Sequence, residues 1–463
     1  MCRLLTRVFA GGAALSLSGC LLGPDYARPP TPEPEAWHAS LGEGLSPASP
    51  ERAALATWWT VLGDPLLSDL VSQALDRNLD VQVAHQRVRE ARQRRAVAEA
   101  GLWPTLRGRA TVSPARTSHA RSQATGLEAL WNLDVFGKQR RTIEAAEGDR
   151  GASEEDLHSA LVNVAAEVVQ SYIDLRTFQA HLAIADANLA AETETAQLAS
   201  WRAQAGLTNT LDVLQATADA AQRRAQIPSL RASLEEAKNR LALLEGETPG
   251  ALSSQLDRAQ PLPTAPPEVA VGIPADALRQ RPDVRRAERQ LAAETARIGA
   301  AKAEAYPTIS LSGAVGTGVI GPATFTSPQS ITAAAAAEAV QVLFDHGAIR
   351  ATIKGQKAVR GEALARFQST VLAALNDVEA GIIEYREEQQ RERGLAEASA
   401  SAASAATISR ERYAAGLVDF QVVLDAERSL YSIEEQRVSS QGRVIADLVR
   451  LYRSLGGGWS AET

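Results

Sequence analysis

The chain has 463 residues, of which 45% are hydrophobic and only 5% aromatic. This composition is typical of a folded protein, and an alanine-rich, aromatic-poor chain suits long, closely packed helices better than a large mixed core. The formal net charge of −7 provides no basic surface, so we expect no nucleic-acid partner.

The first 19 residues have the pattern of a bacterial signal peptide. Arg3 and Arg7 precede an apolar run over residues 8–17, which is too short to span a bilayer. The following tetrapeptide LSGC, residues 17–20, looks like a lipobox, so we expect cleavage before Cys20 and its acylation; an ordinary signal with an incidental cysteine is the alternative. No Asp follows to suggest retention at the inner membrane, and two or three acyl chains anchor stably. We therefore expect a lipid-anchored protein of the outer membrane that extends into the periplasm.

Residues 20–55 are rich in Pro, Gly and Ser, which predicts an extended tether with no core of its own. A helical segment is predicted from Trp58 to about Leu102, because apolar residues recur there at helical spacing. Pro104 ends it.

A two-residue alternation then predicts β-strands. In the second of them Leu127, Ala129, Trp131 and Leu133 form an apolar face, whereas intervening positions such as Glu128 are mostly polar. The same pattern returns later in the chain, more weakly in its last strand. The predicted strands cover about 105–114, 123–136, 307–317 and 332–345.

A long helix and a hairpin tip follow the first pair of strands. Residues 138–205 lack proline and carry a seven-residue hydrophobic repeat, which predicts a coiled-coil helix of roughly 100 Å at about 1.5 Å per residue. At Gly206 and Leu207 a glycine C-cap and a following N-cap residue predict a tight turn into a returning helix. The same skeleton recurs 210 positions later at Gly416 and Leu417, so the chain is an internal duplication.

The spacing between the two copies locates a difference between them. Pro104 and Pro307 lie 203 positions apart, whereas positions beyond the strands lie 210 apart. The second copy therefore gains seven residues between its strands, within 316–330, where we expect an external loop. The landmarks divide the chain into a signal peptide (1–19), a tether (20–55), a first repeat (56–246), a Pro-rich connector (247–275), a second repeat (276–458) and a C-terminal tail (459–463).

Four strands per chain constrain the architecture. Strands persist in lipid only when they close into a barrel, because an open edge leaves backbone groups unsatisfied. Four cannot close alone; eight from a dimer give a filled interior, and twelve from a trimer leave a lumen. A channel would therefore be a hollow trimer, with Trp131 and Leu133 facing lipid and Glu128, Asn132 and Asp134 facing water. Two short soluble hairpins on a coiled-coil protein are the alternative.

Several motifs spread over the mature chain carry a resemblance to the outer membrane factor family, and in particular to its TolC-like lipoprotein branch of the NodT/OprM efflux type. In order, they are Gly23-Pro24-Asp25-Tyr26, Trp58-Trp59 with Asp64-Pro65, Trp131 through Gly137, Arg281-Pro282-Asp283-Val284, Tyr306-Pro307, Val423-Leu424-Asp425-Ala426 and Leu455-Gly456. One departure is the alanine-rich fourth strand, ITAAAAAEAVQVLFDHG, which places Glu338 within a predicted strand.

The resemblance implies a mainly α-helical channel tunnel with a β-barrel part. Three copies would form a twelve-stranded barrel in the outer membrane, continued across the periplasm by a tunnel of twelve long helices. It also implies docking to a periplasmic adaptor (a membrane fusion protein) and, through it, to an inner-membrane pump of the resistance-nodulation-division type. The channel would be passive and would need no cofactor.

The resemblance also assigns roles near the tips. Asp212 falls opposite Val422, and Gln215 opposite Asp425, on a face that rings a closed periplasmic aperture in the family. We therefore predict a cation-favouring constriction of Asp212, Val422 and Asp425, with a solvated helix face as the alternative for the carboxylates. Arg412 and Tyr413 are predicted to make polar contacts that hold the aperture shut. The turn residues are also the predicted adaptor docking site: Gly206, Leu207, Gly416 and Leu417.

No catalytic or metal-binding motif accompanies these features. The histidines are scattered without ligand spacing, and there is no phosphate-binding glycine loop or nucleophile motif, so we do not expect an enzyme. The predicted function is the outer membrane channel of a tripartite efflux system that exports drugs or other toxic small molecules. The alternatives are a type I secretion duct and, from another class, a periplasmic coiled-coil scaffold lipoprotein without a pore.

Overall fold

We describe a computed structural model for residues 21–31, 34–42, 44–49, 51–114, 121–320 and 331–460; the signal peptide and Cys20 lie outside these ranges. The chain divides into two compact units, and each takes segments from both sequence repeats. The first contains Met1–Pro30, Gln86–Glu154 and Arg286–Ser369, and the second contains Thr31–His85, Glu155–Arg285 and Thr370–Thr463.

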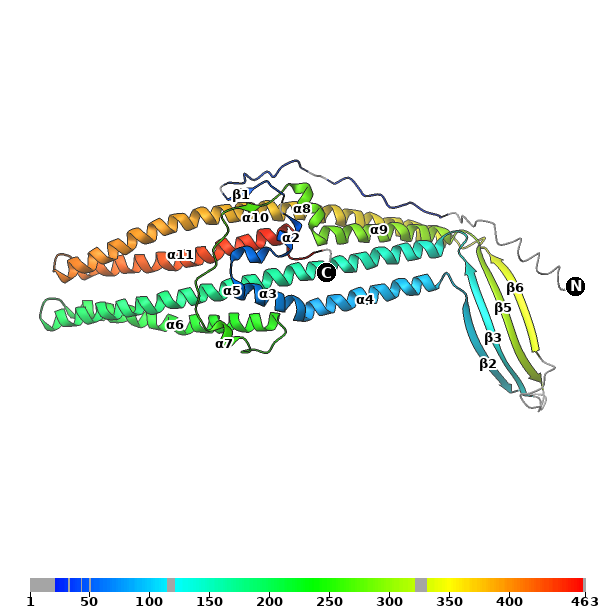
Figure 1. The fold of residues 1–463 in the computed structure, drawn as a ribbon, viewed down its shortest axis with the longest axis horizontal. Coiled ribbons are helices and arrows are strands. Elements are labelled where there is room, and N and C mark those ends of the chain that lie inside the picture. The colour runs from blue at the N-terminus through cyan, green and yellow to red at the C-terminus, as the bar shows by residue number, and fades with distance from the viewer. Residues whose placement is uncertain are drawn as a thin grey trace. The chain divides into compact units, whose positions relative to one another are not determined.

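The first unit contains a four-stranded antiparallel sheet (Figure 1). Its strands follow the order β2-β3-β5-β6, so the two hairpins from the two repeats pair through β3 and β5. The outer edges of β2 and β6 have no partner strand within the described part of the chain. The strand bounds are β2 Thr105–Pro114, β3 Arg121–Leu133, β5 Thr308–Ile320 and β6 Ile331–Val340.

The register gives the sheet one apolar and one mostly polar face, because directly paired residues project to the same side. Leu127 pairs with Val315, Trp131 with Leu311, and Leu133 with Ile309. On the opposite face Asn132 pairs with Ser310, which in turn pairs with Glu338. The alternation read along β3 therefore continues across the sheet, and the departure at Glu338 falls on the polar face.

Two predicted strands are too long at their C-terminal ends. β3 ends at Leu133 rather than 136, and β6 ends at Val340 rather than 345. Their common partner β5 begins at Thr308, directly after Pro307, so the ladder has no further rungs. The residues after β6 lead into the next helix: the Asp345 side chain accepts a hydrogen bond from the backbone N–H of Ile349 at 2.7 Å.

β5 is longer than predicted. It continues to Ile320, so the first residues of the loop expected at 316–330 belong to a strand; residues 321–330 lie outside the described ranges.

The predicted single helical segment from Trp58 to Leu102 is broken twice. A left-handed Gly63 ends the short helix η1 (Trp58–Leu62), and Asp64 then caps α3 (Pro65–Arg77), accepting the backbone N–H of Leu67 at 3.2 Å. Asn78 starts α4 (Leu79–Ala100) by accepting the N–H of Asp80 at 2.8 Å. Short polar side chains that bond their own backbone thus outweigh the apolar periodicity here.

The remaining long helices repeat the duplication in their lengths. The two longest have 67 residues each and the two that return from the tips have 35 each. Their bounds are α5 Lys138–Gln204, α6 Thr210–Leu244, α9 Pro282–Ala303, α10 Ala348–Ala414 and α11 Phe420–Ser454. Within the described residues, no helix is both long and apolar enough to cross a membrane.

The tether and tail of the second unit are packed against it. β1 (Leu45–Ser46) pairs in parallel with β4 (Val269–Ala270) of the connector. Trp459 of the C-terminal tail stacks on His158, with ring centroids 4.1 Å apart. The connector also contains α7 (Ser253–Leu256) and is followed by α8 (Pro274–Gln280), whereas α2 (Arg52–Ala56) ends the tether.

Candidate functional site: the paired hairpin tips

Both predicted tips are tight helix-to-helix turns in the second unit (Figure 1). Gly206 and Gly416 adopt left-handed backbone angles, with φ of 74° and 73°, a conformation that is costly for a residue with a Cβ atom. Each turn closes with a backbone bond, from Leu207 N to Arg202 O at 2.8 Å and from Leu417 N to Arg412 O at 2.9 Å. The two leucines are largely exposed, at 66% and 74%.

The two returning helices start differently. Asn209 caps α6, because its side chain accepts the backbone N–H of Asp212 at 3.1 Å. Asp419 holds the same position before α11, but its side chain makes no capping bond. Only the first tip therefore has the side-chain cap that both sequences predict.

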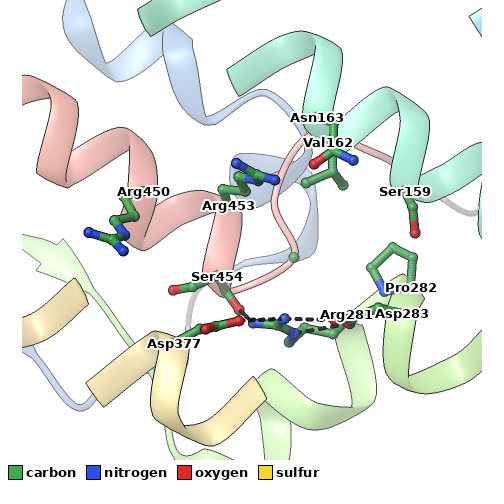
Figure 2. A pocket seen from close by; sticks show the side chains of 11 residues that line it. Ser159, Val162, Asn163, Arg281, Pro282, Asp283, Asp377, Arg450, Arg453 and Ser454 are labelled. Atoms are coloured by element: carbon green, nitrogen blue, oxygen red, sulfur yellow. Dashed lines mark hydrogen bonds and ion pairs between the residues drawn. The ribbon is translucent and has the colours of Figure 1, made fainter. Parts of the chain in front are cut away.

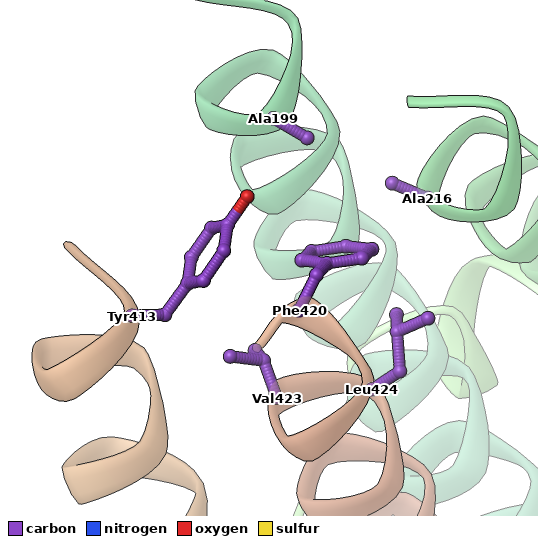
Figure 3. Packing of buried hydrophobic residues seen from close by; sticks show 6 residues of the cluster. All are labelled: Ala199, Ala216, Tyr413, Phe420, Val423 and Leu424. Carbon is purple, nitrogen blue, oxygen red and sulfur yellow. The ribbon is translucent and has the colours of Figure 1, made fainter. Parts of the chain in front are cut away.

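A buried cluster joins the two hairpins just behind the tips (Figure 3). All four helices contribute to it, and the rings of Tyr413 and Phe420 lie 5.2 Å apart between them. Because this packing removes apolar surface from water, it favours closed, adjacent hairpins within one copy. The buried members are Ala199, Ala216, Tyr413, Phe420, Val423 and Leu424.

Arg202 makes the polar connection between the tips. Its guanidinium donates to the backbone carbonyls of Tyr413 at 2.9 Å and Ala414 at 3.3 Å, and lies 4.6 Å from the centre of the Tyr413 ring. Those carbonyls end α10, where the helix carries partial negative charge and lacks intrahelical partners. Arg202 therefore caps the other hairpin's helix, assisted by a cation–π contact.

The predicted contacts of Arg412 and Tyr413 differ from one another in this copy. Tyr413 is buried, and burial raises the pKa of its hydroxyl, whereas Arg412 is exposed. Arg202 was missed by the sequence analysis, although it lies 210 positions before Arg412 and the duplication could have identified it. A role for Arg412 at the aperture stays a prediction.

Ion pairs continue the connection farther from the tips. Arg428 of α11 donates to both carboxylate oxygens of Asp219 on α6, each at 2.9 Å. Arg223 of α6 pairs with Glu435 of α11 at 2.9 Å. These links were also missed, because no sequence pattern states which charged residue of one helix meets which residue of another.

The three aperture residues have different surroundings. Val422 and Asp425 share an exposed face of α11, turned away from the buried Val423 and Leu424. Asp212 is half-buried, and its carboxylate accepts a hydrogen bond from Thr208 within its own hairpin. A ring of these residues requires further copies of the chain, so the constriction stays a prediction.

Residues of two of the sequence motifs form hydrogen bonds with a buried arginine. Arg281 borders a cavity of about 390 Å³ and donates to Asp283 at 2.7 Å, to Asp377 at 3.0 Å and to the Ser454 carbonyl at 2.9 Å, which ties α9, α10 and the end of α11 together (Figure 2). In the first unit the buried Arg141 donates to Asp25 at 2.8 Å and to the Leu22 carbonyl at 2.9 Å, holding the segment that follows Cys20. Removing a partner of a buried arginine leaves its charge uncompensated and is therefore destabilising.

The remaining predicted residues are placed as follows. Trp131 is 37% exposed on the apolar face of the sheet and its indole N–H donates to the Leu102 carbonyl at 2.8 Å, whereas Leu133 is half-buried. Cys20 lies outside the described residues. Among the residues that the structure describes, no group of three or more His, Cys, Asp or Glu side chains is arranged to hold a metal ion.

The sequence was also compared with models of known protein families. The sequence model of the outer membrane efflux protein family matches residues 70–247 and 273–457. The two matches begin 203 residues apart and end 210 apart, which agrees with the offsets between the two repeats.

Individual proteins match along nearly the whole chain. Nodulation protein T of Rhizobium leguminosarum bv. trifolii is 32% identical over 97% of this chain and 96% of its own. The solvent efflux pump outer membrane protein SrpC of Pseudomonas putida is 30% identical over 97% and 98%. The solved outer-membrane channel OprN is 34% identical and superposes with a TM-score of 0.87, covering 95% of this chain and all of its own.

Proposed function

The chain belongs to the outer membrane efflux protein family, and we propose that three copies form the passive outer membrane duct of a tripartite efflux system. The duct would receive small toxic molecules from an inner-membrane pump through a periplasmic adaptor. Its cargo would be chosen by the pump, because an open water-filled duct discriminates only weakly.

The sheet with two open edges is the observation that carries this proposal. Its strands have 10, 13, 13 and 10 residues, and about 9–11 tilted residues suffice to cross a bilayer. A sheet that is apolar on one face and polar on the other can sit in lipid only if its edges close on further strands. Three copies supply twelve strands, enough to leave a lumen.

Apolar side chains beside both open edges support closure between copies. Trp103, just before β2, is 72% exposed, and Leu343 and Phe344, just beyond β6, are 91% and 78% exposed; Leu106, which is 70% exposed, pairs with Ala129 on the apolar face. Exposed apolar groups of this size are costly in water and typical of surfaces that a partner covers. A neighbouring copy would place one edge against the other and bury both sets.

Anchoring by an acylated Cys20 fits the same arrangement. The described chain begins at Leu21, and Arg141 with its bonds to Leu22 and Asp25 holds that segment on the same compact unit as the sheet. A lipid anchor there would keep the chain at the membrane surface.

The hairpin tips are the surface that we assign to the adaptor. Leu207 and Leu417 are exposed at the turns, so they can enter a partner's apolar groove without any rearrangement of this chain. The aperture residues Asp212, Val422 and Asp425 would then lie next to the docked adaptor.

Purification and electrical recording test the proposal. The full-length protein in detergent should have the mass of a trimer and should give discrete conductance steps in planar bilayers. A monomer without conductance would contradict the proposal and would favour the coiled-coil scaffold.

A further inference from the structure

A buried group of charged side chains joins the two hairpins at a short distance from the tips. Glu192 of α5 is 7% exposed and Glu427 of α11 is 2% exposed. With Asp219 of α6 they line a cavity of about 10 Å³. A cavity of this size holds one water molecule at most, so the only ligands that fit are a proton and a single water.

Glu427 has two partners, both on its oxygen Oε1. Its carboxylate pairs with Arg410 of α10 at 2.7 Å and accepts a hydrogen bond from the Thr195 hydroxyl of α5 at 3.2 Å. Asp219 likewise holds both oxygens against Arg428. Arg410 and Thr195 favour the charge on Glu427, but burial is the larger cause and raises the pKa of its carboxyl.

Glu192 is poorly compensated. Among the described residues its ion-pair partner is Arg223, which lies 3.5 Å away and is shared with Glu435 at a shorter 2.9 Å. The other carboxylate oxygen of Glu192, Oε2, is buried and has no hydrogen-bond partner. An unpartnered, buried carboxylate oxygen is costly when charged and much less so when protonated.

Charges of both signs face Glu192 from the neighbouring helices. Arg223 on α6 favours the ionised form of Glu192 more strongly than Asp219 on α6 and Glu427 on α11 disfavour it, and Arg428 on α11 also interacts with Glu192, so burial is the main cause that opposes the charge. The buried phenol Tyr431 of α11 faces the same group, and its oxygen has no partner either. Counted together, the ionised acids outnumber the arginines by one: Glu192, Asp219, Glu427 and Glu435 against Arg223, Arg410 and Arg428.

We propose that Glu192 is a proton-binding site at the seam between the hairpins, protonated while they pack together and deprotonated when they part. Neutral Glu192 brings the group to charge balance and allows its second oxygen to act as a hydroxyl donor in the small cavity. Separation of the hairpins returns water to the side chain and releases the proton. Proton uptake is thereby coupled to closure.

The direction of the pH effect follows from linkage. Burial first, and then Asp219 and Glu427, raise the pKa of Glu192 above its ordinary value in the closed arrangement. Stability of the closed seam therefore increases as the pH falls through this raised pKa, and levels off below the ordinary carboxyl pKa. Burial also raises the pKa of Glu427, so this second acid changes the stability of the seam in the same direction.

This inference rests on the proposed channel function, and its test uses two measurements on the full-length protein in lipid. One is the open fraction in planar bilayers between pH 7 and pH 5. The other is the distance between spin labels at Ala218→Cys on α6 and Ser429→Cys on α11, two exposed positions, with the unsubstituted protein as the labelling blank.

Acidification from pH 7 to pH 5 should lower the open fraction and shorten the label distance. Because one proton is taken up on closure, the closed-to-open ratio should rise by up to tenfold per pH unit. Glu192→Gln imitates the neutral form, so it should stay closed and lose the part of this pH dependence that Glu192 contributes, leaving only the part from Glu427. Glu194→Gln, an exposed carboxylate on the same helix, should behave as the unsubstituted protein.

The two measurements separate the two claims. A label distance that responds to pH through Glu192 in a protein without conductance would contradict the channel and keep the proton site. If the protein conducts, and if Glu192→Gln and the unsubstituted protein show the same gating and the same label distances at each pH, the proton site is overturned. An equal loss of pH dependence in Glu194→Gln would also overturn it.

Discussion

The two hairpin tips have the same sequence skeleton and opposite surroundings. Leu214 and Leu424 lie 210 positions apart at equivalent places, yet Leu214 is 62% exposed and Leu424 is 3% exposed. At this position the second hairpin buries its leucine in the cluster behind the tips, whereas the first hairpin leaves its leucine on the surface. Equivalence in a duplicated sequence therefore preserves the backbone path but does not determine which face is buried.

Arginine positions differ in the same way. Arg202 bridges to the opposite tip, and its equivalent Arg412 is exposed. In each pair one residue is buried or bridges the tips, and its equivalent in the other hairpin is exposed. Substituting both members of a pair therefore tests whether the two hairpins differ.

The leucine pair should give the largest difference. Leu424→Ala removes a fully packed side chain and should destabilise the tip region by about 2–5 kcal/mol. Leu214→Ala should change the stability of the purified protein by less than about 0.5 kcal/mol. Limited proteolysis across a denaturant series measures both, and equal losses would show that the tips are not asymmetric.

The arginine pair should give the next largest effect. Arg202→Met keeps the apolar stem but removes two charge-assisted bonds, worth about 1.5–3 kcal/mol each at most. It should raise the open fraction of the channel in planar bilayers. Arg412→Met is the matched comparison at the exposed position, and an effect confined to it would reverse our assignment and favour the predicted aperture contact of Arg412.

Much of the fold could be predicted from the sequence because hydrophobic periodicity and the glycine, proline and capping residues that end an element are local signals. The alternation around Trp131 and the glycine turns at Gly206 and Gly416 depend only on neighbouring residues, and the strands and tips are found there. The C-terminal end of β6 could not be predicted, since it depends on where β5 begins opposite Val340. Pairings such as Asp219 with Arg428 depend on how helices from different repeats face each other, which no local pattern specifies.

The tip glycines, unlike the leucine and arginine pairs, should behave alike in the two hairpins. Gly206 and Gly416 have nearly the same φ; an added Cβ would meet nothing within 4 Å at Gly206 and only Arg202 Nη2, at an ordinary contact distance of 3.8 Å, at Gly416. Alanine at either turn should therefore cost about 1–2 kcal/mol through backbone strain alone. Thermal unfolding should show similar losses, and a large difference would mean that the two backbones are not equivalent.

The aperture carboxylates should give the smallest change. Asp212→Ala combined with Asp425→Ala removes two negative charges per copy from the predicted constriction. Conductance should rise or cation preference should weaken, and reversal potentials in a salt gradient measure the latter. If neither changes, these residues do not line the narrowest part of the duct.

The central claim is that copies of this chain pool their strands around water, with one face of each strand toward lipid. Single cysteines along β3, modified by a charged thiol reagent during bilayer recording, test it most directly. Conductance should change at positions 128 and 132 on the polar face and should remain unchanged at 127 and 129 on the apolar face. Changes that do not follow this two-residue alternation would contradict the barrel and the channel together.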